Sequence, residues 1–243
     1  MIGWRGRVGL IVPATNTTVE YEFWRIAPEG ISMHFSRMEY LETQDPKEKE
    51  KYLFSMGDYA IDAAKRIAAV KPDIIAFCCT SGSFIKGKEY DKEIIAKIEK
   101  ETNIPAITTS TAVLEAFKYL NLKKIAMATP YHKEVYEKEV QFFEESIPNF
   151  KVISMENLGI VSGLEKGNLF PSSSYISAKE ADRADAEAVF ISCTAWRTFE
   201  IIELLEEDLG KPVITSNQAT IWAIFKKMGL HKVEGYGKLL RTI

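Results

Sequence analysis

Two cysteines stand out in the sequence because each of them ends a short apolar run. The first run ends in Cys79 and the second in Cys193, and a threonine follows each cysteine. Apolar runs of this length, bounded by small polar residues, are typical of strands buried on both faces of a parallel sheet. Open α/β sheets bind their ligands at the carboxyl ends of such strands. The two thiols are therefore predicted to face one pocket.

A pair of thiols can do acid, base and nucleophilic chemistry. The pKa of a cysteine, roughly 8.5, falls when backbone N–H groups or a helix N-terminus face the sulfur. The small residues at 80–83 would let backbone amides approach both the sulfur of Cys79 and a bound anion. Two thiols on opposite sides of a substrate carbon can act as acid and base, or one can attack while the other delivers a proton.

The third cysteine, Cys78, is interpreted as a core residue. Side chains alternate along a strand, so Cys78 points away from the face that carries Cys79. In the second apolar run Ser192 takes its place. A buried free cysteine commonly behaves as a small hydrophobic residue.

Polar residues at the predicted strand ends are candidates for binding a carboxylate. Their hydroxyl, amide and backbone N–H groups can hold a carboxylate without a buried Arg or Lys. The candidates are Thr80, Ser81 and Thr194 beside the thiols, and the turns at 15–17, 130–132 and 215–217. The three residues beside the thiols can also be turn formers or caps. Asn16 can alternatively cap a helix, and Tyr131 can be a core residue with a satisfied hydroxyl.

Strand and helix patterns alternate along the whole chain and position these residues. Strands are predicted at 7–13, 31–38, 74–79, 104–108, 124–130, 150–155, 188–193 and 211–216. Helices are predicted at 19–26, 45–68, 90–102, 110–120, 135–147, 178–186 and 199–209, with a last one that ends before Gly229. The segment 162–174 is rich in Gly, Ser and Pro and is expected to form a mobile flap over the cleft.

The pattern repeats with a period of about 110 residues, which covers nearly the whole chain. The matching pairs are Pro13 with Pro130, Cys79 with Cys193, and Pro105 with Pro212. The predicted fold class is α/β, with two similar flavodoxin-like lobes. Each lobe has a mostly parallel four-stranded sheet, and a pseudo-twofold axis places the active site between them. The first lobe is assigned to 1–112 and the second to 113–217, while a C-terminal helix within 218–243 packs back on the first lobe.

Composition and charge exclude several classes of protein. The chain has 243 residues, of which 46% are hydrophobic, and its net charge is only -3, so nucleic-acid binding has little electrostatic support. No apolar run approaches the roughly 18 residues of a membrane span, and no signal peptide is recognised. Zinc and nucleotide motifs are absent from the sequence, so neither a metal nor a cofactor is expected. Three cysteines make a disulfide framework improbable and favour a cytoplasmic location. Exposed aromatic residues on the first lobe predict a homodimer.

Five motifs, spread along the chain in order, resemble the aspartate/glutamate racemase superfamily. They are 12–20, 79–84, 129–131, 192–194 and 215–219. Within that superfamily the chain is most similar to the branch of maleate cis-trans isomerases and arylmalonate decarboxylases. The resemblance implies cofactor-free chemistry on a small carboxylate. The decarboxylases keep only the second cysteine, so the presence of both favours an isomerase or a racemase.

In the isomerases, the residue that matches Cys79 adds to the alkene of maleate, and the residue that matches Cys193 assists by proton transfer. The resulting single bond rotates, and elimination gives fumarate. The resemblance further implies that Asn16 and Tyr131 bind a carboxylate. It also implies a third carboxylate-binding residue, an asparagine, with Asn157 as the best match and Asn168 as the alternative.

The leading hypothesis is therefore maleate isomerisation by two cysteines. The alternatives are an amino-acid or hydantoin racemase that moves a proton between two thiols, an arylmalonate-type decarboxylase, and a two-lobed protein that binds a small ligand without chemistry. Thiol reactivity separates the last of these from the enzymes, because a catalytic thiol is reactive and protected by its ligand.

Overall fold

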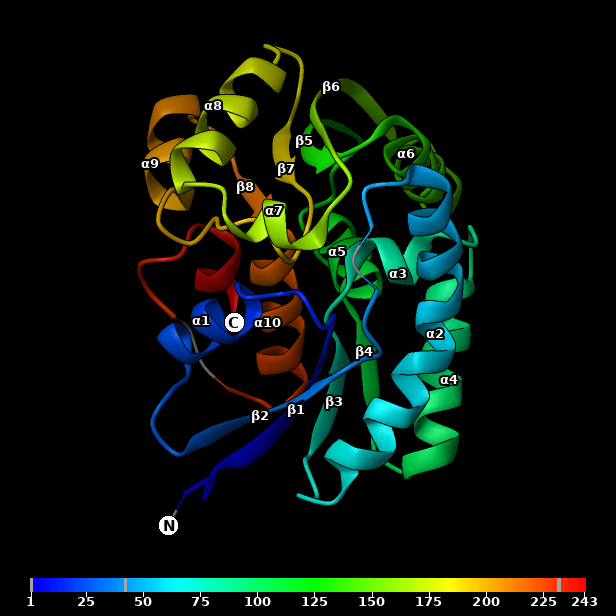
Figure 1. The fold of residues 1–243 in the computed structure, drawn as a ribbon. Coiled ribbons are helices and arrows are strands. Elements are labelled where there is room, and N and C mark those ends of the chain that lie inside the picture. Colours follow the sequence, from blue (N-terminus) through cyan, green and yellow to red (C-terminus); the bar gives the residue numbers. More distant parts are fainter. Residues whose placement is uncertain (1, 42, 231–232) are drawn as a thin grey trace.

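A computed structural model describes residues 2–41, 43–230 and 233–243, which fold around two four-stranded sheets (Figure 1). The strand order is β2-β1-β3-β4 in one sheet and β6-β5-β7-β8 in the other. The strands are β1 (Gly6–Val12), β2 (Ile31–Arg37), β3 (Ile74–Phe77), β4 (Ala106–Thr108), β5 (Lys124–Tyr131), β6 (Lys151–Ile160), β7 (Ala188–Ile191) and β8 (Val213–Thr215). All pairings are parallel. The predicted fold class, with two equivalent parallel sheets, is confirmed.

Helices cover these sheets on both faces. They are α1 (Val19–Ile26), α2 (Pro46–Ala68), α3 (Thr80–Phe84), α4 (Tyr90–Thr102), α5 (Thr109–Tyr119), α6 (Lys133–Ser146), α7 (Gly163–Gly167), α8 (Pro171–Ala181), α9 (Ile202–Leu209) and α10 (Ser216–Lys227). The central strands β3 and β7 are fully buried, as their unbroken apolar sequences require. The strands of each sheet end toward the middle of the molecule, where the two halves meet (Figure 1).

The last helix of each half packs against the other half. Phe117 of α5 lies among Phe143, Phe150 and Phe190 of the second half, with ring centroids 5.2–5.3 Å away. In return α10 packs on α1 and β3 of the first half, and it lies along α5. The lobe boundaries predicted after residues 112 and 217 fall inside these two helices, so the division at these positions stays a prediction.

Two segments differ from the sequence prediction, and the C-terminal helix agrees with it. The expected flap at 162–174 contains α7, which Ser162 caps by accepting a hydrogen bond from the Glu165 N–H, and the first turn of α8. A proline at the start of α8 fixes a helical φ there, so the helix lies well before the predicted 178–186. The C-terminal helix ends at Lys227, and in the described residues beyond it only a 3-10 helix, Leu239–Thr242, follows. This end agrees with the last helix predicted to stop before Gly229.

Tryptophans divide into a buried and an exposed pair. Trp196 and Trp222 are buried, whereas Trp4 and Trp24 have exposed fractions of 61% and 53%. The homodimer inferred from exposed aromatic residues and the cytoplasmic location both stay predictions. Among the described residues, none of the helices has the length and apolar character needed to span a bilayer.

The packing of Phe117 generates a test of the coupling between the halves. We expect Phe117→Ala to lower the free energy of unfolding by about 3–5 kcal/mol, because a fully buried aromatic ring leaves a cavity when it is truncated. Urea unfolding followed by circular dichroism measures the change. The control is Leu204→Ala on α9. The side chain of Leu204 is half exposed, so its truncation should lower the free energy of unfolding much less. Equal losses in the two variants would contradict the role assigned to Phe117.

Candidate active site

A small cavity opens where the carboxyl ends of β1, β3, β5 and β7 meet. Six of the eight predicted site residues line it, and they come from both halves of the chain. They are Asn16, Cys79, Ser81, Tyr131, Cys193 and Thr194. The two thiols thus share one cavity. The catalytic and binding roles of these residues remain proposals.

Two predicted residues lie elsewhere. Thr80 is fully buried beneath the cavity, where its hydroxyl donates to the Ser216 Oγ at 2.9 Å. Asn157 sits on the edge strand β6, paired with Thr129, and is not among the cavity residues. Its alternative, Asn168, is exposed at the end of α7. The chain beyond β6 turns back and presents α7 to the cavity in place of either asparagine.

Cys79 ends β3 and caps the short helix α3. The N–H of Gly82 donates to its sulfur at 3.3 Å, and the Ser81 Oγ lies 3.8 Å away. Burial nevertheless raises the pKa of Cys79 to about 11, and these two hydrogen bonds and the charge of Lys49 oppose that rise only in part. The backbone amide that the sequence predicted beside the sulfur is present. Its lowering effect on the pKa is outweighed because the sulfur is buried away from water.

Cys193 ends its strand in a different backbone conformation. Its φ is 98°, a value that only glycine adopts without strain, and its N–H donates to the Ser216 Oγ at 3.0 Å. Burial raises the pKa of Cys193, while Lys166, the Ala195 N–H and the Tyr131 hydroxyl lower it. Such a conformation costs on the order of 1–3 kcal/mol, so the surrounding contacts must hold it in place.

Hydrogen bonds join the two thiol segments directly. The side chain of Asn16 donates to the Thr194 Oγ1 at 3.1 Å, and the Thr194 hydroxyl donates to the carbonyl of Cys78, also at 3.1 Å. The other end of the Asn16 amide accepts the N–H groups of Thr18 and Val19, both at 2.9 Å. Asn16 therefore organises the start of α1 and lines the cavity at the same time, so the two interpretations of this residue are compatible.

Two lysines that the sequence had not indicated as site residues also line the cavity. Lys49 and Lys166 have exposed fractions of 8% and 5%. Buried lysines are therefore present in addition to the polar groups that the sequence identified. Lys49 could have been recognised, because it lies at helical spacing with the buried Tyr52, Leu53 and Met56 of α2. Lys166 could not, because its position depends on how α7 folds over the cavity.

The lysines are placed by neighbouring groups. The Lys166 ammonium donates to the carbonyl of Val161 at 3.1 Å and lies 5.1 Å from the ring centroid of Tyr131. The Lys49 ammonium lies 5.2 Å from the ring centroid of Tyr52. Two cations beside two thiols suit a substrate with two carboxylates. Within the described residues no cluster of three or more His, Cys, Asp or Glu side chains is arranged to hold a metal ion.

Comparison with known proteins identifies related chains. The family model of arylmalonate decarboxylase (Amdase) matches residues 8–240. The maleate isomerase of Geobacillus stearothermophilus is 26% identical, with 96% of each chain covered. Two solved structures share the fold. Maleate isomerase Iso from Pseudomonas putida S16, solved with maleate, has a TM-score of 0.90 at 24% identity and covers 97% of each chain. The Nocardia farcinica maleate cis-trans isomerase with a covalently bound succinylcysteine intermediate has a TM-score of 0.89 at 23% identity, covering 98% of this chain and 99% of that one.

The lysines generate a crossed test of thiol reactivity. We expect Lys49→Gln to slow iodoacetamide labelling of Cys79 about threefold at pH 8 with little effect on Cys193, because its charge lowers the pKa of Cys79. Lys166→Gln should do the reverse, because its charge acts on Cys193. Mass spectrometry of the two cysteine peptides measures both rates in a Cys78→Ala background, where each peptide holds one thiol. Equal slowing at both thiols would contradict this assignment.

Proposed function

The chain belongs to the arylmalonate decarboxylase family, and we propose that within this family it is a cofactor-independent isomerase that converts maleate into fumarate. The observation that carries the proposal is the presence of two thiols, Cys79 and Cys193, in one cavity with two buried lysines. The similarity to maleate isomerases over nearly the whole chain supports maleate as the substrate. A second thiol also fits isomerisation better than decarboxylation, in which one thiol protonates the enediolate that remains after carbon dioxide leaves.

Substrate binding would use charge and hydrogen bonds together. Lys49 and Lys166 would each face one carboxylate of maleate, which compensates the cost of holding two cations in a nearly dry cavity. Asn16, Ser81 and Thr194 supply polar groups at the cavity wall. Tyr131 hydrogen-bonds to Cys193 and lies beside Lys166, so it would orient both the thiol and the bound carboxylate.

The chemistry begins once one proton has left the thiol pair. The Cys79 thiolate attacks C2 of maleate and forms an S–C2 bond, and the π electrons take a proton onto C3 from the Cys193 thiol. The product is a succinyl group on Cys79, with Cys193 as the thiolate. The C2–C3 bond is now single and rotates by half a turn. Cys193 then removes the proton from C3, the S–C2 bond breaks, and fumarate leaves.

The adjacent cysteines Cys78 and Cys79 allow a test that compares the loss of one thiol with the loss of the other. We expect Cys79→Ala to lower the rate of fumarate formation by about a thousandfold or more, because no sulfur remains to form the adduct. Cys78→Ala should stay within about threefold of the wild type, because Cys78 is fully buried in the core and outside the cavity. Proton NMR of the alkene signals follows both variants.

Full turnover by Cys79→Ala would contradict the covalent route. Incubation in heavy water with aspartate and with phenylmalonate distinguishes the alternatives. Deuterium at an α-carbon without isomerisation of maleate would indicate a racemase, and carbon dioxide release from phenylmalonate would indicate a decarboxylase.

The lysines predict a preference for dianions. We expect Lys49→Gln to raise the KM for maleate about tenfold, because one charge-assisted contact to a carboxylate is lost. The affinity of the same variant for the monoamide of maleate, which carries one charge less, should fall much less. Lys51→Gln is the matched control, since Lys51 lies on the same helix but is exposed to solvent. An unchanged KM in Lys49→Gln, or the same rise in both variants, would argue against this role.

A further inference from the structure

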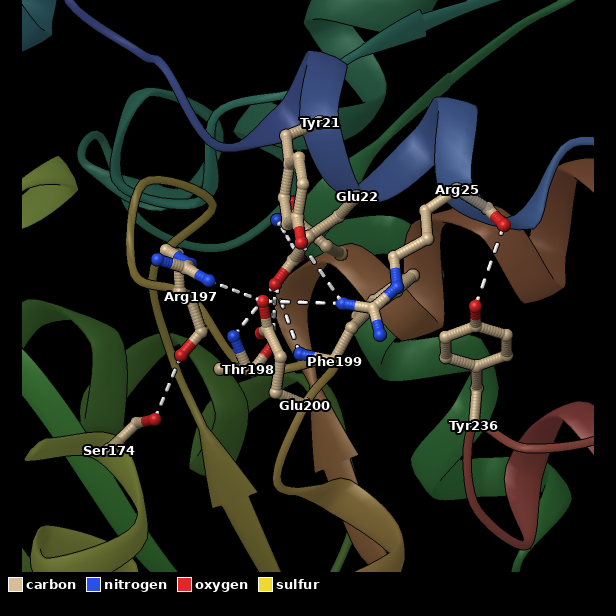
Figure 2. A network of polar contacts seen from close by, with 10 residues as sticks. Tyr21, Glu22, Arg25, Ser174, Arg197, Thr198, Phe199, Glu200 and Tyr236 are labelled. Atoms are coloured by element: carbon tan, nitrogen blue, oxygen red, sulfur yellow. Dashed lines mark hydrogen bonds and ion pairs between the residues drawn. The ribbon is translucent and has the colours of Figure 1, made fainter. Parts of the chain in front are cut away.

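A carboxylate from the first half of the chain is buried inside the segment that follows Cys193 (Figure 2). Glu22 lies on α1 and is fully buried. Its Oε1 accepts the backbone N–H groups of Thr198 at 2.7 Å and Phe199 at 3.0 Å. Its Oε2 accepts the side-chain amide of Asn217 at 2.6 Å. All these donors belong to the second half, so Glu22 links the two halves behind the cavity.

Asn217 connects Glu22 to Thr194, the residue that follows Cys193. The same Nδ2 that donates to Glu22 also donates to the carbonyl of Thr194 at 3.0 Å. The preceding residue, Ser216, accepts the N–H of Cys193. The start of α10 therefore holds the backbone on both sides of Cys193, and Glu22 fixes the asparagine of this pair.

The cations nearest to Glu22 are engaged with another carboxylate. Arg197 and Arg25 lie 2.6 Å and 3.3 Å from Glu200, as Figure 2 shows. Glu22 thus depends on neutral donors, and burial raises its pKa to about 7. A buried carboxylate of this kind costs stability that a neutral side chain would not. Its contacts converge on a segment whose first residue, Cys193, has a strained backbone.

We propose that Glu22 is a positioning residue for Cys193. Its carboxylate fixes the segment 193–199 and, through Asn217, the strained backbone that directs the thiol into the cavity. The proposal rests on the proposed role of Cys193 as the proton donor, but the position of the thiol can be measured without turnover.

The test compares the two thiols within one molecule. Glu22→Gln keeps the shape of the side chain but turns a donor toward at least one of the N–H groups that Glu22 accepts. In a Cys78→Ala background, we expect iodoacetamide labelling of Cys193 in the ligand-free protein to accelerate at least fivefold. The labelling rate of Cys79 should stay within twofold. For maleate, kcat should fall at least tenfold while KM stays within threefold, because the lysine contacts are intact.

A second buried glutamate provides the matched control. Glu206 accepts the N–H groups of Val213 at 3.0 Å and Lys238 at 2.8 Å, and it is not among the residues that line the cavity. Glu206→Gln removes comparable hydrogen bonds and should change neither labelling rate. Should Glu22→Gln fail to fold, Asn217→Ser breaks the same link and is expected to accelerate Cys193 alone.

Three outcomes would overturn the positioning role. These are an unchanged labelling rate at Cys193, equal acceleration of both thiols, or the same effect in Glu206→Gln. A wild-type protein that leaves maleate unchanged overturns the proposed substrate instead. The labelling ratio would still decide whether Glu22 positions Cys193, because that measurement uses no substrate.

Discussion

The arrangement of the site depends on hydrogen bonds that join the two halves behind the thiols. Thr194 donates to the carbonyl of Cys78, so the end of one thiol-bearing strand is bonded to the end of the other. The exchanged helices α5 and α10 add a hydrogen bond between Thr220 and Thr109 at 3.0 Å. These contacts are buried, where an unmade hydrogen bond costs free energy. The two thiols therefore cannot move apart without breaking the core that supports them.

The same burial that fixes the thiols disfavours their ionised forms. Removing water raises the pKa of Cys79 and Cys193, and the nearby lysines and N–H groups only partly reverse the effect. A protonated thiol is a poor nucleophile, so one thiol of the pair has to lose its proton before it can attack. In the proposed reaction each lysine would have two roles, because a cation that lowers the pKa of a nearby thiol can also bind a carboxylate of the substrate.

The features that depend on local sequence pattern were predicted from the sequence. Apolar runs and the repeat were sufficient for both sheets and for the shared pocket of Cys79 and Cys193, because strand ends in a parallel sheet fall at one edge. Lys49 was readable from helical spacing. The placements of Asn157 and Lys166 were not, because the register of an edge strand and the path of the chain after it depend on tertiary contacts. The raised pKa values of the two thiols could not be predicted from the sequence either, since desolvation is a property of the folded chain.

The two thiols occupy equivalent strand ends but unequal surroundings, and this difference argues for separate roles. Cys79 has an ordinary extended backbone and receives an N–H from the helix that it caps, a contact that offsets part of the rise in its pKa. Cys193 has a strained backbone, held by Ser216 and, through Thr194 and Asn217, by Glu22. A nucleophile benefits from a stabilised anion, whereas a proton donor must be held in a defined direction toward its carbon. The repeat places the pair, and the unequal contacts around it distinguish the attacking sulfur from the proton-donating one.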